Sequence, residues 1–477
     1  MSEEFLITIR TIADSILIED PLEMQPHLVD WRKRHEGTAL AVALPRSTQA
    51  VSEIVGLCSK YRVPIFPQGG NTSVCGGSVP DTRRNGIVVN LRRMNRILSV
   101  DPEDNSLTVE AGCILASVQE AARAADRLFP MSLGAEGSCQ IGGNVATNAG
   151  GTAVIRYGNM RDLVLGIEAV LPDGTIWNGL RTLRKNNSGY DLKNLFIGSE
   201  GTLGIITAAA LKLFPLPRHT ITALAAVASI EDAAFLATEL QIQFPGAVSA
   251  IELISSSELE LVIKHIGGTA SPFTGEAPWY ALIEVDGAEG EALMSDRLAG
   301  MLEASMETGA VIDATIASNE RRRQQLWHIR HHVTEANVRE GMGLTHDIAV
   351  PPARVPQFVR RAEAALAAHF PRAVPVIVGH LGDGNLHYIA MFSHADWATT
   401  SDKPACTAAV NRLLYDIAVE LGGTFSAEHG IGSIHLAEMQ YYKQAPELAL
   451  MRTLKQTIDP LGIMNPGRVL PSFRASA

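Results

Sequence analysis

The amino-acid sequence predicts an α+β protein built from two folded regions and a C-terminal segment. In the first region short strands alternate with helices and glycine-rich loops, and in the second longer strands alternate with Ala/Glu/Leu-rich helices. The second pattern is typical of an α+β domain with an antiparallel sheet. We expect domains at residues 1–215, with a core at 38–215, and at 216–425, followed by a segment at 426–477.

The first region carries the clearer local signals. Strands are expected at 40–45, 63–67, 86–91 and 107–111. A helix follows the first of them, because apolar residues from Val51 to Cys58 recur at helical spacing. Ser47 or Thr48 can cap this helix through a side-chain oxygen.

The second region opens at Pro215-Leu-Pro217, which is typical of a domain boundary. A strand is expected at 280–285, and helices are expected at 231–243, 289–308 and 356–369. The C-terminal segment holds one amphipathic helix near 446–458 and ends in a stretch rich in Pro and Gly.

Composition places the chain among globular enzymes. It has 477 residues, 46% hydrophobic and 19% charged, with 40 Lys and Arg against 51 Asp and Glu, so the formal net charge is 40 − 51 = −11. This acidic balance argues against binding to nucleic acid. The N-terminus lacks the basic and apolar pattern of a secretory signal, and no stretch reaches the roughly 20 apolar residues of a membrane span. The five cysteines form no CxxC pair, which argues against disulfides and a built-in iron–sulfur centre. We expect a cytoplasmic protein.

Three glycine-rich loops, at 67–77, 133–151 and 196–207, fall in the first region. Glycine lets the backbone approach a ligand closely, and successive N–H groups can then bind an anion without a basic side chain. The first loop matches neither the Walker pattern nor a GxGxxG turn between a strand and a helix. A single loop of this kind is more often a plain tight turn, but three in one domain indicate backbone wrapped around an extended cofactor.

The stretch "GHLGDGNLHY" at 379–388 predicts a β-hairpin around Asp383-Gly384. A two-residue type I′ turn there would place His380 directly opposite His387 on one face of the strand pair. Opposed Cβ atoms lie about 4.5–5.5 Å apart, a distance from which two imidazoles can bind one metal ion. The alternative is two polar residues beside a loop, and the hairpin alone leaves both open.

Six motifs occur in an order that resembles one family. They are "PQGGNTSVCGG" (67–77), "GSCQIGGNVATNAGG" (137–151), "GSEGTLGIIT" (198–207), "GHLGDGNLH" (379–387), "SAEHGIG" (426–432) and "IMNPGRVL" (463–470). Together they resemble the FAD-dependent D-2-hydroxy acid dehydrogenases, of the D-2-hydroxyglutarate and D-lactate dehydrogenase type. These belong to the vanillyl-alcohol oxidase/p-cresol methylhydroxylase (PCMH) flavoprotein superfamily. The resemblance covers about residues 30–470.

The resemblance implies a PCMH-type FAD-binding domain to which the C-terminal segment returns, and a substrate-binding cap domain in between. The residues expected to contact FAD are Gln68, Gly69, Gly70, Asn71, Thr72, Ser73, Ser132, Leu133, Gly134, Gly142, Gly143, Asn144, Thr147, Asn148, Glu200, Gly201, Ile205 and Asn465. Covalently flavinylated relatives often carry histidine after the paired glycines of the first loop. Asn71 stands there in this chain, so we expect non-covalent FAD.

The resemblance also implies a divalent metal, most suitably Zn²⁺, held by His380, His387 and Glu428. Its open positions would chelate the carboxylate and hydroxyl of a 2-hydroxy acid, with His380 close to the substrate as well. His429 is then the candidate base that removes the hydroxyl proton. Without the resemblance, His429 would equally well be a histidine capping a glycine turn.

A cation is expected to bind the substrate's carboxylate. Apolar residues at 326, 329 and 333 mark the buried side of a helix, and Arg330 and Thr334, four residues apart, would lie together beside that stripe. Arg321 to Arg323 fit a solvated helix flank better. Thr345 is expected to contribute to the substrate pocket.

The sequence departs from the 2-hydroxyglutarate pattern at three positions. Lysine is usual where Thr345 stands, asparagine where Ile389 stands, and often lysine where His435 stands. These changes weaken the case for a second carboxylate on the substrate, although His346 could replace part of the lost charge. We expect oxidation of a D-2-hydroxy acid, with D-2-hydroxyglutarate or a related acid favoured.

Three alternatives stay open at this point. One is a D-lactate or glycolate dehydrogenase subunit, which would need an iron–sulfur partner. Another is a non-redox transferase resembling alkyl-dihydroxyacetonephosphate synthase, and the third is a flavin-binding module without catalysis. For the main hypothesis we expect a homodimer, with electron-transfer flavoprotein, a quinone or a cytochrome as electron acceptor.

Overall fold

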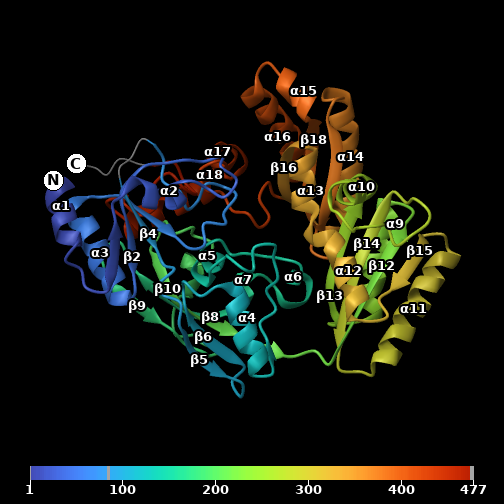
Figure 1. The fold of residues 1–477 in the computed structure, drawn as a ribbon, viewed down its shortest axis with the longest axis horizontal. Coiled ribbons are helices and arrows are strands. Elements are labelled where there is room, and N and C mark those ends of the chain that lie inside the picture. The colour runs from blue at the N-terminus through green and yellow to red at the C-terminus, as the bar shows by residue number, and fades with distance from the viewer. Residues whose placement is uncertain (1, 83–85, 473–477) are drawn as a thin grey trace. The chain divides into compact units, whose positions relative to one another are not determined.

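The chain folds into two compact units in a computed structural model that describes residues 2–82 and 86–472. Unit 1 contains the described residues of Met1–Gly151, Gly158–Leu216 and Glu428–Ala477. Unit 2 contains Thr152–Tyr157 and Pro217–Ala427. The chain therefore enters unit 2 twice, first for a short helix and then for a complete domain (Figure 1).

Unit 1 contains two larger sheets and one two-stranded sheet. Its strands are β1 (Ser15–Ile18), β2 (Ala39–Pro45), β3 (Ile65–Gln68), β4 (Gly86–Asn90), β5 (Ile97–Asp101), β6 (Ser106–Glu110), β7 (Arg127–Leu128), β8 (Val164–Val170), β9 (Ile176–Gly179), β10 (Ile205–Lys212) and β11 (Phe214–Pro215). Its helices are α1 (Ser2–Ile9), α2 (Pro21–Leu28), α3 (Thr48–Tyr61), α4 (Leu115–Ala124), α5 (Ile141–Ala146), α7 (Met160–Leu163), α8 (Lys193–Phe196), α17 (Leu436–Tyr442) and α18 (Ala445–Ile458). One sheet has the order β1-β2-β4-β3, with β2, β4 and β3 parallel, and the other is antiparallel with the order β5-β6-β10-β8-β9.

Helix α3 shows how local sequence sets an element of unit 1. The side chain of Ser47 accepts a hydrogen bond from the backbone N–H of Ala50 at 3.2 Å, so the helix begins where the sequence predicts. Arg62 adopts the left-handed conformation with φ +55° and ends it. The apolar side from Val51 to Cys58 is buried in the core next to β3 and β4.

Unit 2 contains one large sheet. Its strands are β12 (His219–Val227), β13 (Val248–Ser255), β14 (Trp279–Gly287), β15 (Val311–Ile316), β16 (Gly341–Ala349), β17 (Val374–His380) and β18 (Asn385–Ser393). Its helices are α6 (Val154–Tyr157), α9 (Ile230–Gln243), α10 (Ser256–His265), α11 (Glu291–Glu307), α12 (Glu320–His331), α13 (Val333–Glu340), the 3₁₀ turn η1 (Pro352–Arg354), α14 (Val355–His369), α15 (His394–Thr399) and α16 (Lys403–Glu420). The strand order is β15-β12-β14-β13-β17-β18-β16, and every neighbouring pair is antiparallel. The predicted α+β class with an antiparallel sheet in the second region is confirmed.

Helices α10, α12 and α13 cover one face of this sheet. Ile254 and Val378 on the strands belong to one buried cluster with Leu326, Ile329 and Val333 on the helices. The predicted apolar stripe at 326, 329 and 333 is thus the buried side of this helical segment. It packs α12 against the sheet to which the hairpin strands belong.

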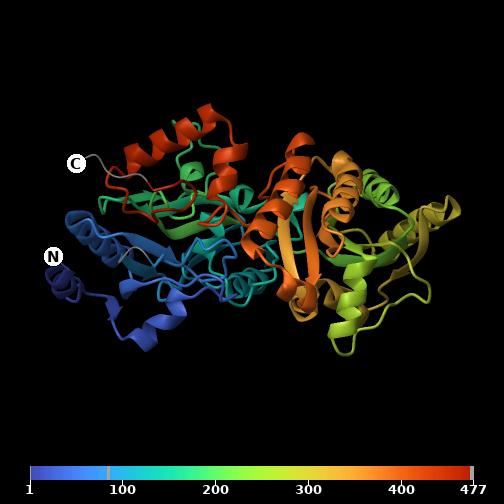
Figure 2. The same ribbon diagram turned by 90° about the horizontal axis from the view of Figure 1, so that it is seen from above.

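The C-terminal segment, red in Figures 1 and 2, returns to unit 1 beside the blue N-terminal strands. Met464 forms a parallel bridge with Ile65 of β3. The buried Lys455 Nζ donates to Asp459 Oδ2 at 2.6 Å and to the carbonyl oxygens of Met464 and Thr202 at 2.8 and 2.7 Å. A buried charge of this kind is stable only when it is fully paired, so Lys455 holds the tail in one place.

Within residues 2–82 and 86–472, no helix has both the length and the apolar character that crossing a bilayer requires.

Candidate functional site

The two histidines of the hairpin lie on one face of the sheet, but in a register that differs from the prediction. β17 ends at His380 and β18 begins at Asn385, and these two residues are paired. His387 is paired with Val378. The predicted direct opposition of His380 and His387 across a two-residue turn is therefore wrong.

The reason lies in the loop at 381–384. The backbone N–H of Leu381 donates to the carbonyl of Ile251 on β13 at 2.9 Å, so it does not join the hairpin ladder. A type I′ turn also needs positive φ at both central residues, and in this described loop Gly384 alone has it, at +81°. The histidines become diagonal neighbours instead of direct ones, and their ring centroids still lie 5.6 Å apart.

His380, His387 and Glu428 form a group suited to a metal ion. One ligand atom of each residue lies within 4.8 Å of the other two. Glu428 directly follows Ala427, the last residue of unit 2. Two imidazoles and a carboxylate are a donor set typical of zinc, and three protein ligands leave a coordination position open. The residues present therefore fit a catalytic divalent cation.

Asp347 on β16 positions two parts of this group. It pairs with His387 in the strand register, and its Oδ1 lies 3.8 Å from His387 Nδ1. Asn385 Nδ2 donates to the same oxygen at 2.9 Å. The backbone N–H of Ala427 donates to Asp347 Oδ2 at 3.1 Å. Asp347 thereby fixes the chain immediately before Glu428.

Glu252 on β13 connects His380 with Arg330. Its Oε1 lies 2.6 Å from His380 Nδ1, and its Oε2 accepts from Arg330 Nε at 2.5 Å. The Glu252 side chain is fully buried, and those of His380 and Arg330 are 7% and 12% exposed. Burial alone would raise the pKa of Glu252, but the charges and hydrogen bonds of His380 and Arg330 lower this pKa to about 2. The carboxyl group is therefore ionised at neutral pH.

The segment that carries Arg330 and Thr334 is not one continuous helix. α12 ends at His331, His332 leaves helical geometry with φ −102° and ψ 6°, and α13 begins at Val333. Arg330 is the last residue but one of α12, whereas Thr334 is exposed in the first turn of α13. The prediction that both project from one face of a single helix is wrong for this reason.

Thr345 and His346 point to opposite faces of the sheet, because successive residues of a strand alternate. Thr345 is exposed and pairs with Ile389, on the face that also carries His387. His346 is buried on the other face, where its Nε2 lies 2.9 Å from the Asn411 side chain of α16. The prediction that His346 supplies a charge beside Thr345 is therefore wrong.

The sheet face beyond His387 is apolar. Ile389 forms a buried cluster with Val376 and Met391, against which Leu261 of α10 packs. At the position where relatives of the 2-hydroxyglutarate type were expected to have asparagine, this chain has a buried aliphatic side chain. Thr345 therefore has the aliphatic side chain of Ile389 as its strand partner, where an amide was expected in those relatives.

A second buried carboxyl group, Glu258 of α10, lies near Arg330. It accepts from Asn337 Nδ2 at 2.9 Å. Burial raises its pKa to about 7, although the hydrogen bond from Asn337 and the charge of Arg330 act in the opposite direction. In an unfolded chain the pKa is about 4.5. Between pH 4.5 and 7 only the unfolded state loses the proton, so the free energy of unfolding falls as pH rises through this window.

Glu258→Gln removes the titrating carboxyl group, so the stability that the parent protein loses between pH 4.5 and 7 is kept. We expect the variant's free energy of unfolding at pH 8 to be higher by up to about 3 kcal/mol, with little change at pH 4.5. Thermal or denaturant unfolding at both pH values measures the difference. Glu260→Gln, an exposed change on the same helix, is the control. A difference between Glu258→Gln and the parent protein that does not depend on pH would contradict the prediction.

The first glycine-rich loop, expected to bind the pyrophosphate of FAD, follows β3 in unit 1. The Gln68 side chain is buried and already occupied, since it donates to the carbonyls of His27 and Ser78 and accepts from Asn90. Asn71 has φ +55°, and its Nδ2 donates to the Val29 carbonyl at 2.8 Å. These side chains shape the loop and leave its backbone to face a ligand.

The second loop packs tightly against the first. A Cβ at Gly70 would lie 2.0 Å from the carbonyl oxygen of Ser138, which excludes any side chain there. A Cβ at Gly143, in contrast, would meet no atom within 4 Å. The adjacent Asn144 Oδ1 is buried without a hydrogen-bond partner in the part of the chain that the structure describes. Open space beside an unsatisfied polar atom fits a bound cofactor.

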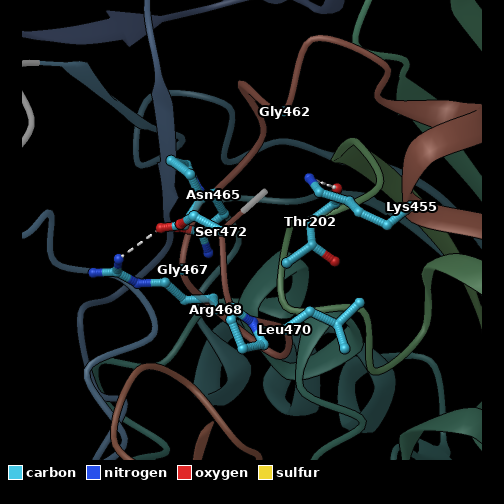
Figure 3. A pocket seen from close by; sticks show the side chains of 10 residues that line it. Thr202, Lys455, Gly462, Asn465, Gly467, Arg468, Leu470 and Ser472 are labelled. Carbon is cyan, nitrogen blue, oxygen red and sulfur yellow. Dashed lines mark hydrogen bonds between the residues drawn. The ribbon is translucent and has the colours of Figure 1, made fainter. Parts of the chain in front are cut away.

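The third loop and the C-terminal tail meet at Glu200 and Asn465, and both have positive φ, +52° and +40°. Asn465 Nδ2 donates to the carbonyls of Glu200 and Gly77 at 2.7 and 3.0 Å, while its buried Oδ1 has no partner among the described residues. It lies at a small pocket with Lys455 and Thr202 (Figure 3). Strained non-glycine backbone is often found at ligand sites, and Asn71 and Asn148 share it, at +55° and +51°. The residues expected to hold FAD thus fit such a group.

Glu200 also fixes the chain that carries His429. Its carboxylate accepts from the backbone N–H groups of Ile431 and Gly432 at 2.7 and 2.8 Å. Burial raises the pKa of Glu200 above its usual value, although these two hydrogen bonds act in the opposite direction. His429 Nε2 lies 3.6 Å from Glu428 Oε1, so the expected base and the third metal ligand are close.

Sequence reasoning did not identify Glu252 and Asp347. Glu252 does carry a signal, because it is the one charged residue in the run Val248–Ser255, and a charge in a buried strand needs a partner. That partner, His380, is 128 residues away in sequence. Asp347 lies in a polar stretch beside Thr345 and has no comparable signal.

Two family models match this chain. The model described as "FAD linked oxidases, C-terminal domain" matches residues 216–469, and the one described as "FAD binding domain" matches residues 39–179. Mitochondrial D-2-hydroxyglutarate dehydrogenase of Bos taurus is 37% identical over 473 residues, which is 99% of this chain and 84% of the bovine one. D-2-hydroxyglutarate dehydrogenase of Xanthomonas citri is 36% identical over 459 residues, 96% of this chain and 94% of that one. A putative mitochondrial D-lactate dehydrogenase of Schizosaccharomyces pombe is 35% identical over 457 residues, 94% of this chain and 85% of that one.

The fold is also found in solved structures, including the following two. p-Cresol methylhydroxylase with substrate bound has a TM-score of 0.76 at 14% identity, covering 98% of this chain and 96% of that one. An alkyldihydroxyacetonephosphate synthase has a TM-score of 0.73 at 19% identity, covering 97% of this chain and 84% of that one. At these identities the likeness concerns the fold alone.

Proposed function

Because the chain belongs to the FAD-dependent D-2-hydroxy acid dehydrogenase family within the FAD-linked oxidases, we propose that it oxidises a D-2-hydroxy acid to the 2-oxo acid at a metal-assisted site. The observation that carries this proposal is the approach of His380, His387 and Glu428 to within 4.8 Å. His429 directly follows Glu428 in the sequence, and Glu252 joins the buried Arg330 to His380.

In the proposed reaction each of a few residues has a separate role. A divalent cation, with zinc our first choice, would lower the pKa of an α-hydroxyl that it chelates together with the neighbouring carboxylate. His429 removes the hydroxyl proton, and Arg330 binds a substrate carboxylate oxygen through its terminal nitrogens. We propose that Thr334 and Thr345 contact the rest of the substrate. FAD bound by the glycine-rich loops of unit 1 would supply the acceptor for the hydride that leaves Cα.

We propose that FAD binds non-covalently. Its contacts would come from the three glycine-rich loops and from Asn465, and Asn71 offers no nucleophile for a covalent link to the flavin. Acid precipitation of the yellow protein should release all of its FAD into the supernatant. Colour that stays with the protein pellet would contradict a dissociable cofactor.

Two substrate candidates are supported. The names and identities of the relatives favour D-2-hydroxyglutarate or a related acid. The apolar cluster around Ile389, and threonine at position 345, favour a D-2-hydroxy acid without a second carboxylate, such as D-lactate. A second carboxylate buried against that cluster would meet the aliphatic and thioether side chains of Val376, Ile389 and Met391, which cannot compensate its charge.

Anaerobic mixing of the holoenzyme with a panel of D- and L-2-hydroxy acids, with and without chelator, tests the proposal. The expected result is bleaching of the flavin by D-acids and loss of bleaching after chelation. No bleaching by any acid would favour a transferase or an inactive flavin-binding module. Rapid bleaching in the presence of chelator would overturn the role of the metal.

The electron acceptor and assembly are part of the same proposal. We propose a homodimer that passes electrons to an electron-transfer flavoprotein or a quinone, without an iron–sulfur partner. Co-purification of an iron–sulfur protein would instead favour a glycolate-oxidase-type subunit. A cytoplasmic location stays a prediction, since several relatives are named as mitochondrial proteins.

A further inference from the structure

One carboxylate, Glu252, holds a metal-ligating histidine and the substrate-binding arginine at the same time. It lies directly opposite His380 in the pairing of β13 with β17. Its two oxygens serve different partners, Oε1 with His380 Nδ1 at 2.6 Å and Oε2 with Arg330 Nε at 2.5 Å. α12 and β13 are both in unit 2, where Figure 1 labels them.

The first contact sets the chemical form of His380. A carboxylate accepts hydrogen bonds, so His380 must carry its proton on Nδ1 when it is neutral. Nε2 then presents its lone pair, which is the form that binds a divalent cation. A carboxylate behind a ligating imidazole also increases the basicity of that ligand and fixes the ring orientation.

The second contact sets the orientation of Arg330. The guanidinium uses Nε for Glu252, and within residues 2–82 and 86–472 its two terminal nitrogens have no hydrogen-bond partner. A guanidinium held at Nε presents its terminal N–H groups in one direction, where they can bind a carboxylate. Glu252 thus leaves free the part of Arg330 that the proposed reaction uses.

A neighbouring pair provides an internal comparison. Glu284 on β14 accepts from Arg323 Nη1 at 2.8 Å and from Trp327 Nε1 at 2.7 Å, so it also ties α12 to the sheet. Among the described residues its side chain bonds to Thr222, Arg323 and Trp327, none of which is a histidine. Glu284 therefore performs the anchoring part of what Glu252 does without any link to the metal group.

We propose that Glu252 is a positioning residue that couples the two halves of the site, orienting His380 for the cation and Arg330 for the substrate's carboxylate. This inference rests on the proposed function. A merely structural carboxylate would stabilise α12 and leave cation affinity unchanged. A coupling carboxylate has to change both cation affinity and KM.

The test uses full-length holoenzyme and four variants: Glu252→Gln, Arg330→Met, the double variant with both changes, and Glu284→Gln. Cobalt or zinc affinity is measured by competition with a chromophoric chelator, and the visible spectrum of bound Co²⁺ reports the ligand geometry. KM and kcat are measured at saturating cation. Bound FAD and the melting temperature show whether each variant is folded.

Glu252→Gln is expected to weaken cation affinity about 10- to 100-fold, to alter the Co²⁺ spectrum, and to raise KM at least about 10-fold. Arg330→Met should raise KM and leave cation affinity within about threefold of the parent. The double variant removes the buried charge that Glu252→Gln leaves unpaired, so it tests the same point if the single variant fails to fold. It should show weak cation affinity. Glu284→Gln should change neither property.

Two results separate this inference from the proposed function. If the double variant binds Co²⁺ as tightly as Arg330→Met, Glu252 does not orient His380 and the inference is overturned while the proposed function stands. If the parent protein binds no stoichiometric cation, and His387→Ala has the same KM and kcat as the parent, the proposed metal-assisted function is wrong. The inference about Glu252 is then wrong as well.

Discussion

Replacement of His387 by alanine is expected to remove the cation and to lower kcat/KM by at least about 10³-fold. Only His380 and Glu428 of the proposed ligand set would remain, which is too few to hold the ion against water. A cation that polarises the substrate contributes several kcal/mol to transition-state stabilisation, and this contribution is lost with it. FAD content should not change, because the residues proposed to bind FAD belong to unit 1.

Metal analysis of the purified variant, its flavin absorbance and its steady-state kinetics together measure this outcome. His369→Ala, an exposed change at the end of α14, is the control and should keep both cation and activity. Unchanged turnover of His387→Ala after treatment with chelator would show that the reaction needs no metal at this group. Loss of FAD from the variant would mean that the flavin depends on residues beyond the proposed set.

Local sequence predicted those elements that carry a signal of their own. Helix α3 begins at the Ser47 cap, and the strand expected at 280–285 is the centre of β14. In both cases side-chain periodicity and capping groups act over a few residues. No distant contact is needed to predict them.

The hairpin register shows where local reasoning fails. Asp383-Gly384 favours a two-residue turn by its composition, but Leu381 bonds to Ile251 on another strand and lengthens the loop. That bond depends on the pairing of β13 with β17, which brings together residues about 130 positions apart. The prediction that the two histidines lie close together is nevertheless confirmed, because direct and diagonal cross-strand neighbours lie on the same face of the sheet.

The surroundings of the ligands could not be predicted for the same reason. Glu252 and Asp347 reach the histidines only through the strand order of the seven-stranded sheet. The ligands themselves belong to short motifs, whereas the carboxylates behind them lie on strands that the motifs do not include. His346 was assigned to the wrong face of the sheet. Thr345 and His346 are successive residues of β16, so their side chains lie on opposite faces.

The other large effect is expected at the base. His429→Asn should lower the rate of flavin reduction about 10²- to 10⁴-fold, because asparagine cannot accept the hydroxyl proton. The hydrogen bonds from Ile431 and Gly432 to Glu200 hold this segment independently of the imidazole, so cation and FAD contents should not change. Because the substrate must then lose its proton to hydroxide, the residual rate should rise with pH. Stopped-flow reduction at several pH values measures this, with His369→Asn as the control. A rate within threefold of the parent protein would mean that another group takes the proton.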